Sequence, residues 1–175
     1  DVAASYGFSY STTLAVGEEE GLMFGQGHSR YATHVLSGTL HGLPFRTFQY
    51  QFQKGQGKST RTFAFTVYEI TSTGRFPHLY LNYRNDFNPA QLSRFPSRVV
   101  LPAEFEQRFR LYVPESYEIE ALQLFTPDTL ALLLDEKWED DLELRDGKLL
   151  AYCASTGQNV HRFMDQLEKA SRLIE

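Results

Sequence analysis

Aromatic and arginine side chains recur in two short segments rich in sheet-forming residues. Rings offer stacking surfaces and guanidinium groups offer fixed donor forks, so together they could bind a peptide or another ligand. This candidate binding face consists of Tyr80, Tyr83, Arg84, Arg108, Arg110 and Tyr112. Half-buried aromatic residues are also common in sheets that bind nothing, and this plainer interpretation stays open.

Two glycine-containing segments share features with nucleotide-binding loops. Lys54–Ser59 ends like a phosphate-binding loop, but Phe52 stands where that motif requires its first glycine. Gly25-Gln26-Gly27 lacks the third glycine of a dinucleotide-binding fingerprint. The sequence therefore predicts a hairpin loop and a connecting loop, and it predicts no cofactor.

Three histidines lie close together in the sequence. Metal ligands on one strand should be an even number of residues apart, so that they share a face. His28, His34 and His41 are six and seven residues apart, which does not suit one shared site. We interpret them as surface or hydrogen-bonding histidines and predict no metal site.

The remaining reactive groups form no catalytic pattern either. Cys153, the single cysteine, would need a nearby histidine to be a nucleophile, and we place it among leucines, where a thiol is inert. The acidic runs Glu18–Glu20 and Glu139–Asp141 lack the alternating oxygen donors of a calcium loop. No nucleophile-elbow motif occurs. These observations favour a non-enzymatic chain, and an enzyme whose site is built from distant residues stays open as the alternative.

The clearest local signals lie between residues 104 and 153. Alternating apolar residues predict a half-buried strand over residues 104–113. A helix is expected over residues 118–124. Thr126-Pro127-Asp128 then has the residue types of a helix start, since threonine caps, proline suits the first position and aspartate favours the positive end of the dipole.

Asp146-Gly147 predicts a tight hairpin with a type I′ turn, in which both turn residues have positive φ. This register pairs Leu144 with Leu149 and Leu142 with Ala151, since pairing fixes which residues share a face. One face is predicted to point inward and contains Leu142, Leu144, Leu149, Ala151 and Cys153. The other is predicted to point outward, with Leu150 as a misfit, and contains Glu139, Asp141, Glu143, Arg145, Lys148 and Tyr152.

The rest of the chain alternates in the same way. Strands over residues 33–40, 45–53 and 62–70 predict an antiparallel meander, and a further strand is expected over residues 79–83. A short helical turn is expected from Asn88 to Phe95, and a last helix after Ser155. We predict one α+β domain over residues 1–175. Its sheet is mainly antiparallel, with an N-terminal meander, a C-terminal β-α-β-β-α unit and helices packed on one face.

The composition of the chain argues against some classes of function. The chain has 175 residues and a net charge of −5, with apolar and charged fractions typical of a globular domain. Its few lysines and arginines form no large cluster, which argues against nucleic-acid binding. No apolar run is long enough to span a bilayer. The chain begins at Asp1, which suggests a processed product or a fragment.

Several structural motifs resemble an uncharacterised bacterial family, a domain of unknown function that usually follows one or two N-terminal transmembrane helices. The resemblance covers about Tyr6 to Leu173. It implies a membrane-tethered parent protein, with the segment that spans the membrane absent from this chain, and it assigns no catalytic residue. The motifs lie at residues 35–45, 48–50, 104–112, 125–127 and 146–150.

Two functions follow from these observations. The first is a non-enzymatic, soluble domain on the cytoplasmic side of a membrane, which binds a protein or peptide partner. The alternative is an enzyme or a small-molecule-binding domain whose pocket is built from residues distant in sequence. A pocket with convergent polar groups would favour the alternative, and an exposed aromatic patch or open sheet edge would favour the first.

Overall fold

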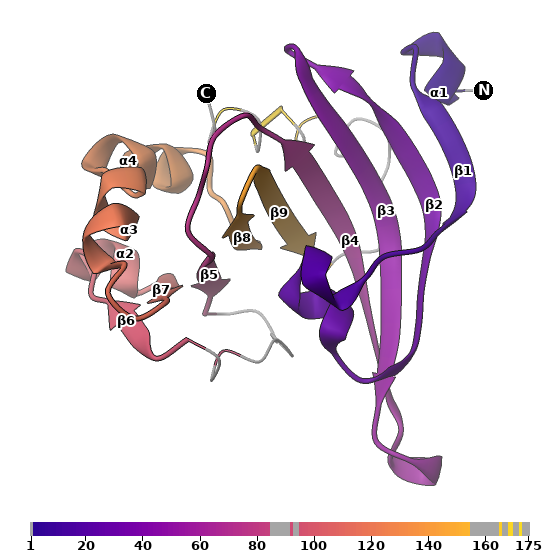
Figure 1. Cartoon of the computed structure of the whole chain (residues 1–175), viewed down its shortest axis with the longest axis horizontal. Coiled ribbons are helices and arrows are strands. Elements are labelled where there is room, and N and C mark those ends of the chain that lie inside the picture. Colours follow the sequence, from indigo (N-terminus) through magenta and orange to yellow (C-terminus); the bar gives the residue numbers. More distant parts are fainter. Residues whose placement is uncertain are drawn as a thin grey trace.

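An antiparallel sheet of nine strands organises the described residues, in the order β1-β2-β3-β4-β9-β8-β5-β7-β6 (Figure 1). This computed structural model describes residues 2–84, 92, 95–154, 165, 168, 169 and 172. The strands are β1 Ser9–Leu14, β2 His28–Leu40, β3 Leu43–Lys54, β4 Arg61–Thr71, β5 Leu79–Tyr83, β6 Ser97–Val99, β7 Phe109–Val113, β8 Asp141–Arg145 and β9 Lys148–Cys153. The predicted meander of β2, β3 and β4 is present.

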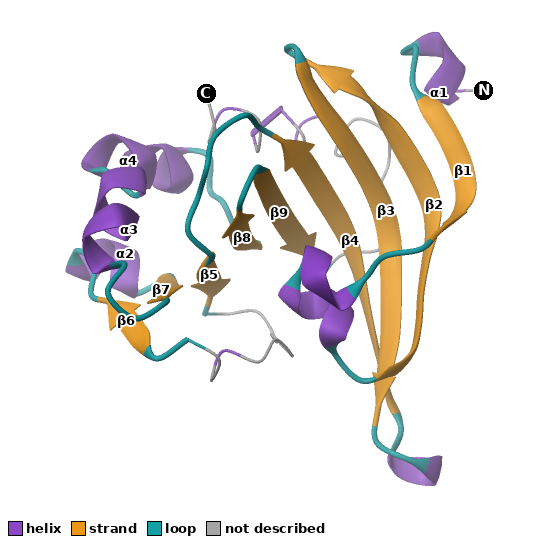
Figure 2. Cartoon of the chain, viewed as in Figure 1, coloured by secondary structure: helices purple, strands orange, loops and turns teal. Residues whose placement is uncertain are grey.

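Short helices precede the first strand and connect later strands along the chain, as Figure 2 shows. The α-helices are α1 Val2–Ser5, α2 Ala103–Glu106, α3 Glu118–Leu124 and α4 Pro127–Asp135, and the 3₁₀ helices are η1 Glu18–Glu20, η2 Leu22–Gly25 and η3 Gly57–Ser59. The predicted start of α4 is confirmed, because Thr126 Oγ1 accepts a hydrogen bond of 3.3 Å from Thr129 N and Pro127 is the first helical residue.

A first hydrophobic core lies between the sheet and helices α2, α3 and α4. The helices contribute Phe105, Ala121, Leu130 and Leu133, which pack against sheet residues such as Leu142. The five hairpin residues that were predicted to point inward all belong to this core. Cys153 is 4% exposed there, so its thiol lies in the apolar surroundings that the sequence predicts.

A second core occupies the other face of the sheet, which the sequence did not predict to be covered. There Leu22, Met23 and Phe24 of η2 pack on strand residues that include Tyr50 and Tyr152. We call residues 18–25, which contain η1 and η2, the η segment. Figure 2 shows it lying across the sheet. The prediction that Asp141, Glu143 and Tyr152 point outward to solvent is therefore wrong, because all three are buried on this face of the sheet.

The η segment approaches the sheet closely at Gly21. A Cβ atom built on Gly21 would lie 2.5 Å from the Tyr152 hydroxyl and 3.1 Å from a Leu150 methyl group. Only glycine leaves room for this contact. Leu150, the misfit of the predicted hairpin, packs in the second core, which explains why an apolar residue stands among polar ones.

The predicted strand over residues 104–113 is only half correct. Residues 103–106 form α2, and β7 starts at Phe109. Phe105 and Phe109 are four residues apart, a spacing that fits one helix face as well as one strand face. Pro102 precedes α2, and its carbonyl oxygen accepts hydrogen bonds from Phe105 N and Glu106 N, so a helical turn replaces the first part of the strand.

The register of the hairpin is confirmed, but its turn type is not. Leu144 pairs with Leu149 and Leu142 with Ala151. Gly147 has a φ of +74°, whereas Asp146 is not among the residues with positive φ, so the turn is not type I′. The loop after β4 explains the difference, because Ser72 N donates to Gly147 O and Gly147 N donates to Gly74 O.

Replacing Gly147 by valine should lower the free energy of unfolding by about 1–3 kcal/mol, because a β-branched residue tolerates positive φ poorly. Urea denaturation of the two proteins measures this loss. Asp146→Ala is the matched control, since Asp146 is exposed and has ordinary φ. Equal losses in the two variants would contradict the assigned turn. Lys148, predicted to be solvated, is unsuitable as a control because its ammonium lies 3.6 Å from the buried carboxylate of Glu69.

Two sequence predictions fall outside the described residues, namely most of the helical turn from Asn88 and most of the last helix. Residues 165, 168, 169 and 172 are helical where the structure describes them. Among the described residues, no helix has the length and apolarity required to cross a bilayer.

Candidate functional site

The predicted aromatic–arginine face does not form as one exposed surface. Tyr80 pairs with Tyr112 and Asn82 with Arg110 across β5 and β7, so Tyr80, Arg110 and Tyr112 share a sheet face. Tyr80 is 0% exposed, so its ring cannot belong to the predicted binding face. Tyr83 lies on the opposite face, where its ring is 5.5 Å from that of Phe109.

The two other arginines of the set lie at the ends of these strands. Arg84 and Arg108 are exposed, and Arg84 N donates to Arg108 O over 2.7 Å. The Arg84 guanidinium also donates to the carbonyl oxygen of Glu106 over 3.2 Å. The structure thus brings all six residues onto β5, β7 and their ends, but it divides them between two faces and the surface.

Glu143 is the centre of a polar cluster that the sequence did not reveal. Its carboxylate is 0% exposed. It accepts hydrogen bonds from Leu22 N at 3.0 Å to each oxygen, from the Tyr152 hydroxyl at 2.5 Å and from His78 Nε2 at 2.7 Å. The Arg145 guanidinium lies 3.7 Å away. Glu143 therefore fixes the η segment to β8, since a buried carboxylate needs such donors.

A second buried carboxylate, Asp141, lies on the same face of β8. It accepts hydrogen bonds from the Tyr80 hydroxyl at 2.9 Å, from Asn82 Nδ2 at 3.2 Å and from Tyr83 N at 2.7 Å. These donors come from β5 and the end of that strand. Asp141 therefore fixes β5 beside β8, and it holds Tyr80 in the interior.

A third group joins the η segment to the long strands. Arg46 of β3 lies 2.9 Å from Glu69 of β4 and 3.1 Å from Glu20 of η1. Lys148 is within 3.7 Å of both carboxylates. Hydrogen bonds from Gly17 N and Arg46, together with the positive charges of Arg46 and Lys148, lower the pKa of Glu20 against the opposing effect of burial.

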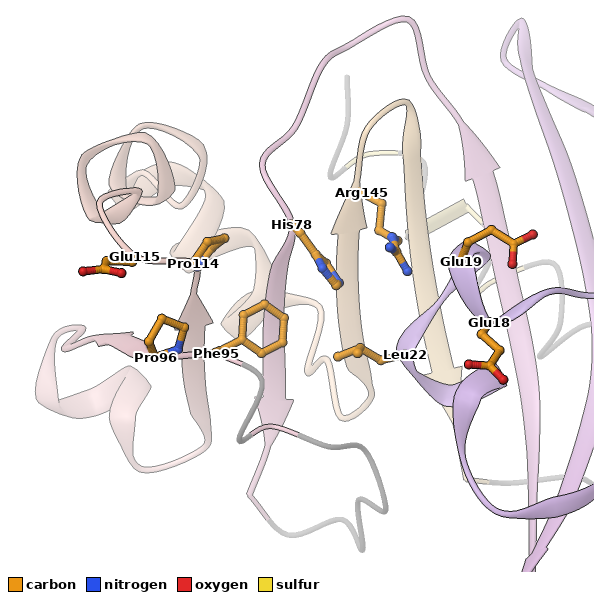
Figure 3. A pocket seen from close by; sticks show the side chains of 9 residues that line it. All are labelled: Glu18, Glu19, Leu22, His78, Phe95, Pro96, Pro114, Glu115 and Arg145. Atoms are coloured by element: carbon orange, nitrogen blue, oxygen red, sulfur yellow. The ribbon is translucent and has the colours of Figure 1, made fainter.

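An open cleft of about 530 Å³ lies between the η segment and the ends of β6 and β7. Figure 3 shows its wall residues, with His78 and Arg145 in the middle and Phe95 beside them. The His78 and Phe95 rings are 5.0 Å apart in an edge-to-face arrangement. The cleft is lined by Glu18, Glu19, Leu22, His78, Phe95, Pro96, Pro114, Glu115 and Arg145.

The cleft has an apolar wall, a polar centre and acidic edges. Phe95, Pro96 and Pro114 supply ring surfaces, and Glu143 beneath the centre orients His78. The described residues that line the cleft include no serine, threonine, cysteine or lysine, and its reactive side chains are carboxylates, His78 and Arg145. The arrangement suits binding of a ligand with polar groups on one side and an apolar surface on the other.

The histidines predicted to be surface residues are exposed. His28 Nε2 lies 2.8 Å from Gly55 O, and His34 Nδ1 lies 3.1 Å from Thr33 Oγ1. Among the described residues, no three histidine, cysteine, aspartate or glutamate side chains gather as metal ligands would. Lys54–Ser59 forms the hairpin tip that contains η3, as predicted for a plain loop.

Three buried tyrosines should respond to alkaline pH. Burial raises the pKa of Tyr50 to about 12, and burial and nearby carboxylates raise the pKa of Tyr80 and Tyr152 well above 10. Above about pH 10 the unfolded chain loses these phenolic protons while the folded chain keeps them, so unfolding becomes more favourable.

We therefore expect the free energy of unfolding to fall as pH rises above about 10, by at most about 1.4 kcal/mol per pH unit for each such tyrosine. Urea denaturation across this range measures the slope, and phenolate absorbance reports ionisation. The buried tyrosines should ionise only when the protein unfolds. Ionisation of all tyrosines near pH 10 in a folded protein would contradict the assigned burial.

The described residues form an α+β fold whose antiparallel sheet is covered on both faces. Its structure is similar to the crystal structure of the mycobacterial trehalose monomycolate transport factor A, TtfA, with a TM-score of 0.69 and 15% sequence identity. The match covers 97% of this chain and 86% of that chain. At this identity the likeness shows a shared fold. No family model and no curated protein matches the sequence.

Proposed function

We propose that this domain binds an amphiphilic lipid in the cleft and serves lipid transport at a membrane without catalysing a reaction. The observation that carries the proposal is the cleft of about 530 Å³, with polar groups from β8 and the start of β5 facing an apolar wall. Its volume lies within the range of small-molecule sites. The likeness to a protein named as a lipid transport factor supports the same class of ligand.

The polar groups beneath the cleft favour binding over catalysis. Both oxygens of Glu143 accept hydrogen bonds from donors of the protein itself. A general base must be free to take a proton from a substrate, whereas the Glu143 carboxylate holds two residues that line the cleft, Leu22 and His78. Preorganised walls lower the ordering cost of binding a ligand.

The test is equilibrium dialysis with two dodecyl amphiphiles, dodecyl maltoside and dodecylphosphocholine, each below its micelle-forming concentration. We expect the wild-type chain to bind at least one of them at a single site. Pro96→Trp fills the cleft from its rim and should weaken binding about tenfold or more. Pro44→Trp is the matched control, since Pro44 is also exposed but lies on β3.

Two results would refute the proposal. One is that the wild-type chain binds neither amphiphile. The other is that the two tryptophan variants bind equally well, which would place the amphiphile outside the cleft. Thermal unfolding of both variants shows that each remains folded.

A second candidate function, binding of a protein or peptide partner, is favoured by the exposed side of α3. Tyr117, Ile119 and Leu122 are 45%, 71% and 49% exposed, and Ile119 and Leu122 are three residues apart on one helix face. Exposed apolar side chains of this kind mark contact sites. An Ile119→Asp, Leu122→Asp variant should lose a partner that co-purifies with the wild-type chain. Retention of that partner would refute this role for α3.

The membrane tether belongs to the proposal as well. Its support is the family resemblance of the sequence, which implies a membrane-tethered parent protein, and we place this domain on the cytoplasmic side. Fractionation of cells that produce the full-length parent chain tests it, together with protease protection of this domain. Recovery of the parent chain outside the membrane fraction would refute the tether.

A further inference from the structure

We infer that the exposed side of α3 binds a basic amphipathic helix of a partner protein. This inference rests on the second function proposed above, partner binding through α3, and it names the chemistry of the partner. Three features carry it: exposed apolar side chains, a local excess of carboxylates and a sheet edge too short for strand addition.

The α3 helix has apolar side chains on both of its sides. Ala121 is 0% exposed and Phe125, which directly follows the helix, is 5% exposed, and both belong to the first core. Ile119 and Leu122 are 71% and 49% exposed, so a large part of their apolar surface is not used to pack α3 on the sheet. Two such residues three positions apart form a ridge of the kind that packs against another helix.

The neighbouring strand extends this apolar surface. The α3 helix contacts β6 (Figure 1), and Val100, which directly follows β6, is 75% exposed. Tyr117, the N-cap residue of α3, is 45% exposed. We call Val100, Tyr117, Ile119 and Leu122 the α3 patch. Exposed apolar side chains that gather in this way mark contact sites.

The residues around the α3 patch are acidic. No lysine or arginine occurs between Arg110 and Lys137. Glu118 and Glu120 flank Ile119 in the sequence. The acidic residues of the stretch include Glu115, Glu118, Glu120, Asp128 and Asp135. A partner that carries lysines or arginines beside its apolar side chains is therefore attracted to this surface.

The same charges disfavour two other occupants. A second copy of the chain bound through the same patch would bring its own Glu118 and Glu120 close to those of the first, and like charges repel. The anionic head groups of a membrane surface would be repelled as well. The arginine of β6, Arg98, changes this little, because its guanidinium lies 2.6 Å from the Glu106 carboxylate.

The nearby edge of the sheet disfavours an extended peptide. The edge strand β6 has three residues, and the segment that contains it is bounded by Pro96 and Pro102. Short edge strands and prolines are features that prevent the addition of a further strand. A helix satisfies its own backbone groups and needs only side-chain contacts, so it suits the α3 patch better.

Calorimetric titration with designed helical peptides of about 14 residues, or about four turns, tests the inference. One peptide has a leucine face and lysines elsewhere, a second has glutamates in place of the lysines, and a third has the residues of the first in an order without an apolar face. The lysine peptide should bind about tenfold or more tightly than either control at about 0.05 M NaCl. Its advantage over the glutamate peptide should shrink at about 0.5 M NaCl, because salt screens exposed charges.

Variants that keep the charge of the chain test the apolar contact. The double variant Ile119→Ser, Leu122→Ser should weaken binding of the lysine peptide about tenfold or more. Tyr31→Ser is the matched control, since Tyr31 is 50% exposed but lies on β2, and it should leave binding unchanged. Thermal unfolding shows that each variant remains folded. Equal binding by the wild-type chain and the double variant would overturn the inference.

Variants that keep the apolar side chains test the charge. Glu118→Gln with Glu120→Gln should weaken binding of the lysine peptide about three- to tenfold, whereas exposed Glu139→Gln should change it by less than about twofold. Wild-type affinity in the first variant, or equal binding of the lysine and glutamate peptides, would overturn the basic chemistry of the partner. The second candidate function would still stand if its partner co-purified through α3.

Two further measurements separate the partner helix from the other occupants. Flotation with phosphatidylcholine vesicles that contain phosphatidylglycerol, and sedimentation of the chain alone, should show neither vesicle binding nor a dimer that depends on Ile119 and Leu122. Either result would overturn the inference in favour of a membrane surface or a second copy. Amphiphile dialysis should be unchanged in all of these variants, because none of the substituted residues lines the cleft.

Discussion

Replacing Glu143 by alanine should cost about 3–5 kcal/mol of stability, a large fraction of the total for a domain of this size. The substitution leaves Leu22 N and the Tyr152 hydroxyl without their acceptor in the interior, since both bond to this carboxylate. Unpaired buried donors carry the full desolvation cost. It also detaches the η segment from β8, so the second core loses part of its cover.

Urea denaturation followed by fluorescence of Trp138, the single tryptophan, measures this loss. Glu139→Ala is the matched control, because Glu139 is exposed and lies at the start of the same hairpin, and it should change stability by less than about 0.5 kcal/mol. If Glu143→Ala and Glu139→Ala were equally stable, Glu143 would not fix the η segment and the assigned cluster would be wrong.

Replacing Phe24 by alanine in the wild-type chain should lower the free energy of unfolding by about 3–5 kcal/mol. Phe24 is 1% exposed and its ring lies 4.8, 5.8 and 6.1 Å from those of Tyr50, Phe48 and Tyr152. The truncation leaves a cavity between the η segment and the sheet. Because Leu22 of the same helix lines the cleft, amphiphile binding should weaken as well.

Denaturation and dialysis of one preparation test both effects of this substitution. Tyr31→Ala removes an aromatic side chain that is 50% exposed on β2, so it should leave binding unchanged and cost much less stability. A stable Phe24→Ala variant that bound amphiphile normally would show that η2 is not a structural wall of the cleft.

Local signals predicted much of the fold. The Asp146-Gly147 turn and the alternation beside it fixed the register of β8 and β9, and Thr126-Pro127 marked the start of α4. These features depend on neighbouring residues only, so one sequence reveals them. The turn type was wrong because its hydrogen bonds come from Ser72 and Gly74, which are distant in the chain.

The site could not be predicted in the same way. Glu143 bonds to Leu22, 121 residues earlier, and to His78, 65 residues earlier, and charged residues on a strand ordinarily indicate a solvated face. The sequence did contain one signal that this face is covered. Leu150 is apolar and Tyr152 is aromatic, and both lie on the face that was predicted to point outward. A strand that is apolar on both faces is typical of a sheet covered on both sides, and the second core shows that cover.

Photo-crosslinking with an alkyl maltoside that carries a diazirine at the first carbons of its chain tests the central claim that the cleft holds the amphiphile. After irradiation, mass spectrometry of the digested chain locates the label. Binding in the cleft predicts label in the peptides that contain residues 18–22, 95–96 and 114–115, and its loss in Pro96→Trp. Label concentrated on Ile119 and Leu122 of α3, or on edge strand β1, would contradict the assignment of the cleft as the ligand site.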